Sequence, residues 1–260
     1  MELTGLIAHF RRPPWPALLA VGAAGHAVWL LGSIGVLPAA VCVAGGGLWA
    51  GGAQQWATVA ATLTLNPPGT LLIGWIIMLV AMMPPLLAAP IVHVRQSSLA
   101  RRRARAVSAF LAGYAIVWIA MGIPLGLLAL LAHSAFGQAA LPLGLAAALA
   151  WSASPAHRRL LNRAHRLRPL SLFGLRADRD SIVFGIEHGL LCAAACWAWM
   201  LVPLLAGSWH YATMLAVGIV LLAERLSLPG APRWRIPPAL TFVLHRATWT
   251  FDRAAAPRNG

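Results

Sequence analysis

The sequence has little charge, and all of its basic side chains belong to one residue type. Only 10% of its 260 residues are charged, none is lysine, and six acidic residues stand against 20 basic ones. Soluble domains devote roughly a quarter of their residues to charged side chains. The composition therefore excludes an ordinary soluble domain. With 60% hydrophobic residues, it is typical of a protein that lies in a lipid bilayer.

Cysteine is also scarce, with three residues in the chain, which excludes a disulfide framework. Cys192 and Cys196 are four residues apart, a spacing at which a disulfide would strain a regular helix. We therefore expect free thiols or metal ligands. Paired carboxylates, a nucleophile–histidine–carboxylate pattern and a phosphate-binding glycine loop are missing as well. No catalytic residue is predicted, and the chain is not assigned to a class of enzyme.

Long apolar runs are what the sequence does have, and a helix needs about 20 such residues to cross a bilayer. The runs predict about six helices, at about 15–38, 69–92, 107–131, 138–153, 183–204 and 209–225. The predicted fold class is an all-α membrane protein, a polytopic bundle of about six transmembrane helices. Its parts are a cytoplasmic lead at 1–14, a transmembrane domain at 15–230 and a cytoplasmic tail at 231–260 that can lie in the interface.

All the basic residues are arginine, and they fall in alternate connections between the predicted helices. The clusters are Arg11–Arg12, Arg95–Arg105, Arg158–Arg179 and Arg225–Arg258. The other connections, about 39–68, 132–137 and 205–208, contain no arginine. Because cytoplasmic connections are enriched in basic residues, both termini are predicted to be cytoplasmic, with the protein in the inner membrane of a bacterial cell.

The net charge of +14 is expected to attract anionic lipid headgroups. A nucleic-acid partner is not expected, because the arginines lie at membrane ends and no nucleic-acid-binding module accompanies them. The first apolar run carries no convincing cleavage site, so we expect it to be retained as the first helix. A membrane-protein partner or a second copy of the chain remains an open expectation.

The most informative segment is GIEHGLLCAAACWAWM at residues 185–200. His188, Cys192, Cys196 and Met200 follow one another at intervals of four, so on a helix they form one stripe. Imidazole, thiol and thioether groups are ligands for soft or intermediate metals, and the stripe predicts a copper site, with zinc as second choice. Because Met200 follows His188 by twelve residues, which extend about 18 Å along a helix, the four side chains cannot all bind one ion.

A second helix has to complete such a site, and Met78 and Met82 lie one turn apart beside Pro84 and Pro85, which are expected to kink their helix. The predicted metal ligands are His188, Cys192, Cys196, Met200, Met78 and Met82. The alternative is that the stripe and the methionine pair are packing faces, with cysteine used as a small residue.

Two acidic residues are candidates for an ion pair or a proton relay. Glu187 is expected to pair with a loop arginine such as Arg179, and Glu224 with its neighbour Arg225. The histidines that lie among the arginines are expected to face solvent or lipid; they are His157, His165 and His245.

Four segments in order resemble the bacterial predicted metal-binding integral membrane proteins, the family of domain of unknown function 2182. The segments are Trp75–Pro85, Phe110–Trp118, His188–Met200 and Glu224–Arg225. The resemblance implies a metal-binding membrane protein but no particular activity. The chain departs from the family where adjacent cysteines would be expected, because it has Ala195 before Cys196, and where a cysteine pair would be expected in a loop, because it has Leu160 and Ala164 there.

The leading functional prediction is an integral membrane protein that binds a soft transition metal, preferably copper, within its helix bundle for metal handling or delivery. The alternative is an accessory subunit of a membrane metalloenzyme complex, either redox-active or non-catalytic, in which cysteine and methionine serve packing. The two predictions differ in whether replacing the cysteines removes a bound metal.

Overall fold

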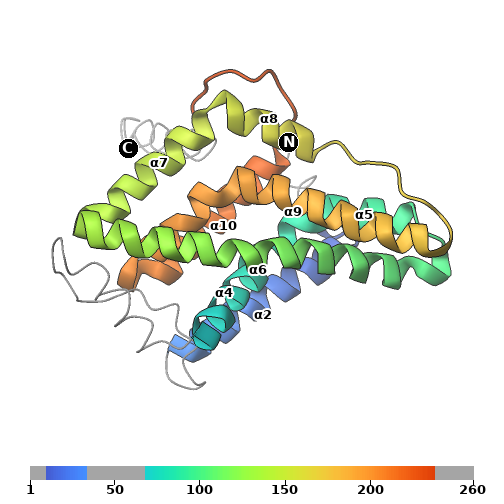
Figure 1. The fold of residues 1–260 in the computed structure, drawn as a ribbon, viewed down its shortest axis with the longest axis horizontal. Helices are drawn as coiled ribbons and strands as arrows, with labels where there is room; N and C mark the ends of the chain where they lie inside the picture. The colour runs from blue at the N-terminus through green and yellow to red at the C-terminus, as the bar shows by residue number, and fades with distance from the viewer. Residues whose placement is uncertain (1–9, 34–67, 238–260) are drawn as a thin grey trace, which may run out of the picture.

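The computed structural model describes residues 10–33 and 68–237, and within these ranges the chain forms helices and no strand (Figure 1). The predicted all-α class is therefore confirmed for the described residues. The elements are α2 (Trp15–Ser33), α4 (Pro68–Met82), η2 (Pro84–Leu87), α5 (Ala88–Gln96), η3 (Ala100–Arg102), α6 (Arg103–Phe136), η4 (Gly137–Ala139), α7 (Ala140–Ala153), α8 (Pro155–Ala164), α9 (Gly174–Leu205), η5 (Gly207–Trp209) and α10 (His210–Leu226).

The helices α6 and α9 begin earlier than their apolar runs predict. Their first turns are polar, and they are held together because Asp178 of α9 forms ion pairs of 2.8 Å with both Arg102 and Arg105. The helix α8 was not predicted at all. Its start is fixed by Ser154, whose side-chain oxygen accepts a hydrogen bond from the His157 backbone N–H at 3.2 Å, as expected of an N-cap residue.

The pair α6 and α9 forms the centre of the molecule, and the two helices run side by side in the same direction (Figure 1). Glycines allow their backbones to touch. A Cβ atom added at Gly185 would lie 2.1 Å from the Phe110 carbonyl oxygen, and one at Gly113 would lie 2.3 Å from the Ile182 carbonyl oxygen. Gly185 and Gly189 have the four-residue spacing that is common in close helix contacts within membranes.

The predicted kink of the second apolar segment is present. The helix α4 ends at Met82, and the segments on the two sides of Met83 are bent by 57° relative to each other. Pro84 and Pro85 begin η2, where they cannot donate backbone hydrogen bonds to the preceding turn. The helix α2 packs against α4 just before this bend, since a Cβ at Gly25 would lie 2.6 Å from the Ala81 backbone nitrogen.

Among the described residues, three helical stretches are long and apolar enough to cross a membrane, or four if the bent pair of α4 and η2–α5 counts as one crossing. One of these stretches, 100–153, contains both α6 and α7. The chain turns between these two helices at Gly137, which has a φ of 60° (Figure 1). Large apolar side chains project outward from the stretches; Ile123, for example, is 77% exposed.

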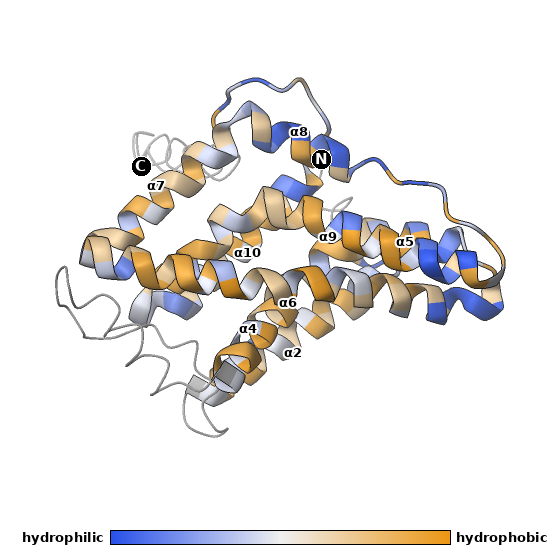
Figure 2. Ribbon diagram, in the orientation of Figure 1, coloured by the Kyte–Doolittle hydropathy of each residue, from blue (hydrophilic) through white to orange (hydrophobic). Residues whose placement is uncertain are grey.

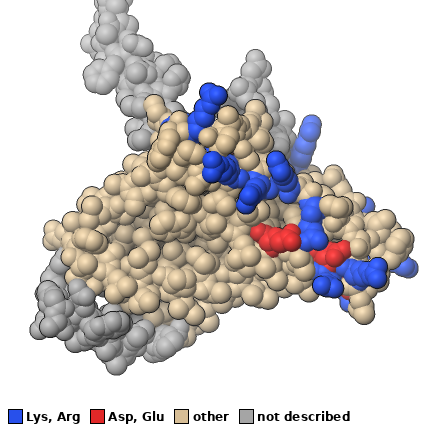
Figure 3. Space-filling view, turned by 45° about the horizontal axis from the view of Figure 1, so that its top comes forward, with Lys and Arg blue, Asp and Glu red and all other residues tan. Residues whose placement is uncertain are grey.

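The polar residues are not spread evenly over this structure. Figure 2 shows hydrophilic residues at α8 and at the end of the molecule where α6 and α9 begin, with mostly hydrophobic residues along the remaining helices. In Figure 3, arginines form a band over one part of the surface, and a broad neighbouring area carries no charge. The fold therefore separates an arginine-rich side from an apolar body.

Candidate metal site

Three sulfur atoms and one hydroxyl group lie close together between α6, α9 and the bend that follows α4. The Sγ atoms of Cys192 and Cys196 are 3.9 Å apart, and both thiols are free. The hydroxyl oxygen of Tyr114 lies 3.3 Å from the Cys192 sulfur and 3.4 Å from the Met83 sulfur. All four side chains are buried. We call Cys192, Cys196, Met83 and Tyr114 the sulfur cluster.

Local sequence explains why these groups meet. The four-residue spacing places Cys192 directly one turn before Cys196 on α9. The glycine contact between Gly185 and the carbonyl of Phe110 brings α6 close to α9, so that Tyr114, one turn after Phe110, reaches Cys192 two turns after Gly185. Met83 continues the hydrogen bonding of α4, its N–H donating to the Leu79 carbonyl at 2.8 Å, immediately before the bend.

The dimensions of the sulfur cluster suit a soft metal ion. At a metal–sulfur distance of about 2.3 Å, two sulfurs bound to one ion lie about 3.8 to 4.6 Å apart. The 3.9 Å separation of the two cysteine sulfurs falls in this range. A thioether near two thiols favours Cu(I) over hard cations. When the thiol of Cys192 ionises, the Tyr114 hydroxyl can donate to the resulting thiolate.

His188 lies on the same face of α9 as the cysteines, but its ring is already engaged. It is buried among the rings of Phe110, Tyr114 and Phe184. Its Nε2 atom accepts a hydrogen bond from the Arg225 guanidinium, so its proton resides on Nδ1. The nitrogen lone pair that would bind a metal is thus directed at a cation. His188 is close to the sulfur cluster without belonging to it.

The predicted methionine ligands lie in the same buried core as the cysteines. Met78 and Met200 are fully buried, and Met82 is almost so. Among the described methionines, however, Met83 is the one that shares a hydrogen-bonding hydroxyl with Cys192. Sequence reasoning favoured Met78 and Met82 because of their helical spacing. The bend at Met83 is what directs the third methionine towards α6.

Glu187 is exposed and pairs with a loop arginine, as expected, but the partner is Arg168 rather than Arg179. The distance between Arg168 and Glu187 is 2.8 Å. Glu187 points away from the stripe because adjacent residues on a helix are about 100° apart. The arrangement is that of a surface ion pair.

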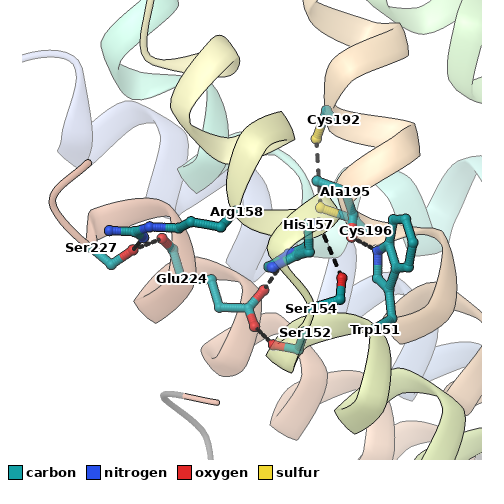
Figure 4. Close-up of polar contacts among 10 residues, drawn as sticks. All are labelled: Trp151, Ser152, Ser154, His157, Arg158, Cys192, Ala195, Cys196, Glu224 and Ser227. Atoms are coloured by element: carbon teal, nitrogen blue, oxygen red, sulfur yellow. Dashed lines mark hydrogen bonds and ion pairs between the residues drawn. The ribbon is translucent and has the colours of Figure 1, made fainter. Parts of the chain in front are cut away.

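Glu224 does not pair with its neighbour Arg225, and this prediction is wrong. Its carboxylate accepts a hydrogen bond from the Ser152 hydroxyl, and it lies 3.4 Å from the Nε2 atom of His157. His157 was expected to face solvent or lipid, yet it is 1% exposed. Figure 4 shows these side chains converging from α7, α8 and α10. We call Ser152, His157 and Glu224 the carboxylate cluster.

Arg158 continues this polar region on α8. Its guanidinium donates hydrogen bonds to the Leu228 carbonyl and, at 3.1 Å, to the Ser227 hydroxyl, so it holds the segment that follows α10 (Figure 4). Burial, and to a lesser degree the nearby Arg235, lower the pKa of Arg158 below its usual value. Of the other predicted histidines, His165 is exposed and His245 lies outside the described residues.

No group of three or more histidine, cysteine, aspartate or glutamate side chains is placed to hold a metal ion within residues 10–33 and 68–237. A third donor for a metal bound by the two cysteines is therefore the thioether of Met83, or His188 after a movement. Tyr114, Met83 and the histidine-bound Arg225 were not predicted to take part. Tyr114 and Arg225 lie within the segments that carry the family resemblance, and this resemblance was the one feature of the sequence that could have indicated a role for them.

The fold and this site define a class: an all-helical protein with long apolar helices and a buried group of soft sulfur donors. The comparisons with known proteins are specific about the family. The chain belongs to the PpoB2 copper chaperone family, whose model matches residues 72–248. This range contains both buried clusters and agrees with the predicted copper handling. No curated protein and no solved structure matches the chain.

Proposed function

We propose that this protein is a polytopic membrane copper chaperone that holds Cu(I) at the sulfur cluster and passes it on. The observation that carries the proposal is the meeting of the Cys192 and Cys196 sulfurs, 3.9 Å apart, with Met83 across the Tyr114 hydroxyl. The two cysteines lie on α9, Tyr114 on α6 and Met83 at the bend after α4, all within the range matched by the copper chaperone family.

The membrane setting is supported by the distribution of charge and by helix length. The stretch 100–153 is too long for one crossing, since 54 residues of continuous helix would extend about 80 Å, whereas a bilayer core is about 30 Å thick. Six crossings result if α6 and α7 are counted separately and α10 is added to α2, the bent pair and α9, although α7 and α10, with 14 and 17 residues, are the shortest of the six. The arginine-rich side would then face the cytoplasm and its anionic headgroups.

The donor set favours transfer of copper over permanent storage. Two thiols and one thioether can hold Cu(I) at a low coordination number, which leaves room for an incoming ligand to attack the ion. A structural zinc site would instead need four donors in a closed tetrahedron. The described residues supply no such set of histidine, cysteine and carboxylate side chains.

The test is copper binding by the purified, full-length protein in detergent, loaded anaerobically with Cu(I). Wild type is expected to retain copper after desalting, and Cys192→Ser combined with Cys196→Ser to lose it, because serine hydroxyls are poor ligands for Cu(I). Met83→Leu should weaken retention in competition with a Cu(I) chelator. Cys42→Ser is the matched control, since Cys42 is the remaining cysteine of the chain.

Copper retention by the double serine variant at the wild-type level would contradict the proposal. The proposal would also be contradicted if Cys42→Ser lost as much copper as the double serine variant. Equal losses in the two variants would indicate that copper binds nonspecifically to any thiol.

A further inference from the structure

A pocket opens beside the bend between α4 and α5. Its wall is formed by the bend itself, by the end of α8 and by the last turns of α10. The polar side chains in this wall are His165 and Arg225. His165 and the end of α8 belong to the arginine-rich side, so the pocket lies on that side, and Arg225 joins its wall to the buried His188.

Arg225 links this pocket to α9. Arg225 lines the pocket, and its guanidinium donates a hydrogen bond to the Nε2 atom of His188. The ion pairs among the described residues do not include Arg225. Its positive charge is therefore directed at a neutral histidine, an arrangement that ordinary charge pairing does not explain.

His188 precedes Cys192 by one turn, and Cys192 precedes Cys196 by one turn. The stripe thus contains two overlapping pairs of donors, Cys192 with Cys196 and His188 with Cys192, and neighbouring side chains on such a face are about 5 to 6 Å apart. A copper ion held by the two cysteines could move one turn along α9 by exchanging Cys196 for His188. That movement would bring it towards the pocket.

Arg225 prevents this exchange in the described arrangement. It occupies the lone pair of His188, and its charge repels a cation that approaches the imidazole. We propose that Arg225 is a latch, meaning a residue that keeps His188 from binding copper. While Arg225 is hydrogen-bonded to His188, copper stays at the cysteine pair. When that hydrogen bond breaks, His188 binds the ion and brings it one turn closer to the pocket at the bend. This inference rests on the proposed function and assigns the route and the positioning residue for copper release.

The experiment compares Arg225→Met with wild type in the full-length, Cu(I)-loaded protein. Methionine keeps most of the side-chain length but removes the charge and the donor. The transfer of copper to an excess of the Cu(I) chelator bathocuproine disulfonate should be faster by about tenfold or more, as expected for the loss of one hydrogen bond to a charged group. X-ray absorption should also show a nitrogen ligand that wild type lacks. His188→Ala added to Arg225→Met should remove both effects.

A second variant tests the route and leaves the latch untouched. Ala89 lines the pocket and is exposed, so Ala89→Phe should narrow the pocket and slow copper transfer several-fold. Ala104→Phe, at an exposed position of α6 on the arginine-rich side, is the matched control and should transfer copper at the wild-type rate. This variant keeps the inference testable if Arg225→Met does not fold.

The outcomes separate the two proposals. If wild type binds no copper, both proposals are overturned. If the double serine variant loses copper but Arg225→Met has the copper ligands and transfer rate of wild type, the proposed sulfur site is supported and the proposed role of Arg225 is wrong. Wild-type transfer through Ala89→Phe would likewise overturn the route.

Discussion

The two buried clusters of this protein differ in how firmly their polar atoms are already held. In the sulfur cluster the contacts are long, from 3.3 to 3.9 Å, and each involves sulfur, a weak hydrogen-bonding partner. In the carboxylate cluster the Ser152 hydroxyl donates a hydrogen bond to the Glu224 carboxylate, whose second oxygen lies 3.4 Å from the His157 Nε2 atom without a hydrogen bond. The first arrangement leaves its donors free for an ion. The second uses its donors to join helices, so burial and polarity alone do not identify a ligand site.

The helix α10 contributes to both regions through two adjacent residues. Glu224 contacts Ser152 and His157, while Arg225 contacts His188 on α9. Adjacent residues on a helix point about 100° apart, so the same turn of α10 can contact α7 and α8 on one side and α9 on the other. We expect substitutions on the two sides of this turn to have different consequences, with loss of stability on one side and altered copper transfer on the other.

The largest effect on stability is expected from Glu224→Ala. The change leaves the buried Ser152 hydroxyl and His157 ring without their partner, and each buried polar group left unsatisfied lowers the free energy of unfolding by about 1–3 kcal/mol. Denaturant or thermal unfolding of the detergent-solubilised protein measures the loss. Copper retained by the fraction that remains folded should equal that of wild type, because the sulfur cluster is made by other helices.

Glu224→Gln is the matched control, since its amide oxygen can still accept the Ser152 hydrogen bond. It should therefore be less destabilising than alanine. If Glu224→Ala instead removed copper while leaving the unfolding midpoint in place, the distinction between the two clusters would be wrong.

A smaller effect, felt mainly at the sulfur cluster, is expected from Gly185→Ala. The added Cβ would lie 2.1 Å from the Phe110 carbonyl oxygen, so α6 and α9 must move apart. Such overpacking lowers the free energy of unfolding by about 1–3 kcal/mol. Because Tyr114 reaches Cys192 only across this contact, copper retention should weaken as well. Competition with a Cu(I) chelator measures that part of the effect.

Gly126→Ala is its control, because nothing lies within 4 Å of a Cβ at Gly126. This substitution within α6 should be neutral or stabilising, by up to about 1 kcal/mol, through higher helix propensity. Equal loss of stability and copper in both variants would show that the close approach at Gly185 does not build the sulfur cluster.

The sequence was informative about what repeats along one helix and uninformative about what meets across helices. The stripe from His188 to Met200 was predicted from residue spacing alone. The apolar parts of α6 and α9 were predicted as well, although both helices begin earlier, with polar first turns. The choice among the three methionines does not, because it depends on the direction of the bend at Met83. A spacing of four residues favours Met78 and Met82. It cannot identify Met83, because the contacts of a residue at a kink depend on the direction of the kink.

Contacts between residues that are distant in the sequence could not be predicted either. Glu224 and Arg225 are adjacent and opposite in charge, so an ion pair between them was the simplest interpretation. In the structure each faces a histidine from another helix: Glu224 lies 3.4 Å from His157, and Arg225 donates a hydrogen bond to His188. His157 was misjudged for a related reason, because its arginine neighbours in sequence say nothing about α8 packing its ring against α10. Tertiary contact overrides local composition at both positions.

The smallest effect is expected at Glu187, which is the exposed neighbour of His188 and provides the sharpest contrast with the stripe. Glu187→Gln breaks the 2.8 Å ion pair with Arg168, whose side chain is also partly exposed. Solvent-exposed pairs contribute less than about 1 kcal/mol, and salt screens them further. We therefore expect a shift in the unfolding midpoint that is small and vanishes at high ionic strength, with unchanged copper retention. A marked loss of copper in this variant would mean that the loop containing Arg168 closes the site, and the functional surface of α9 would then extend beyond the face that holds the cysteines.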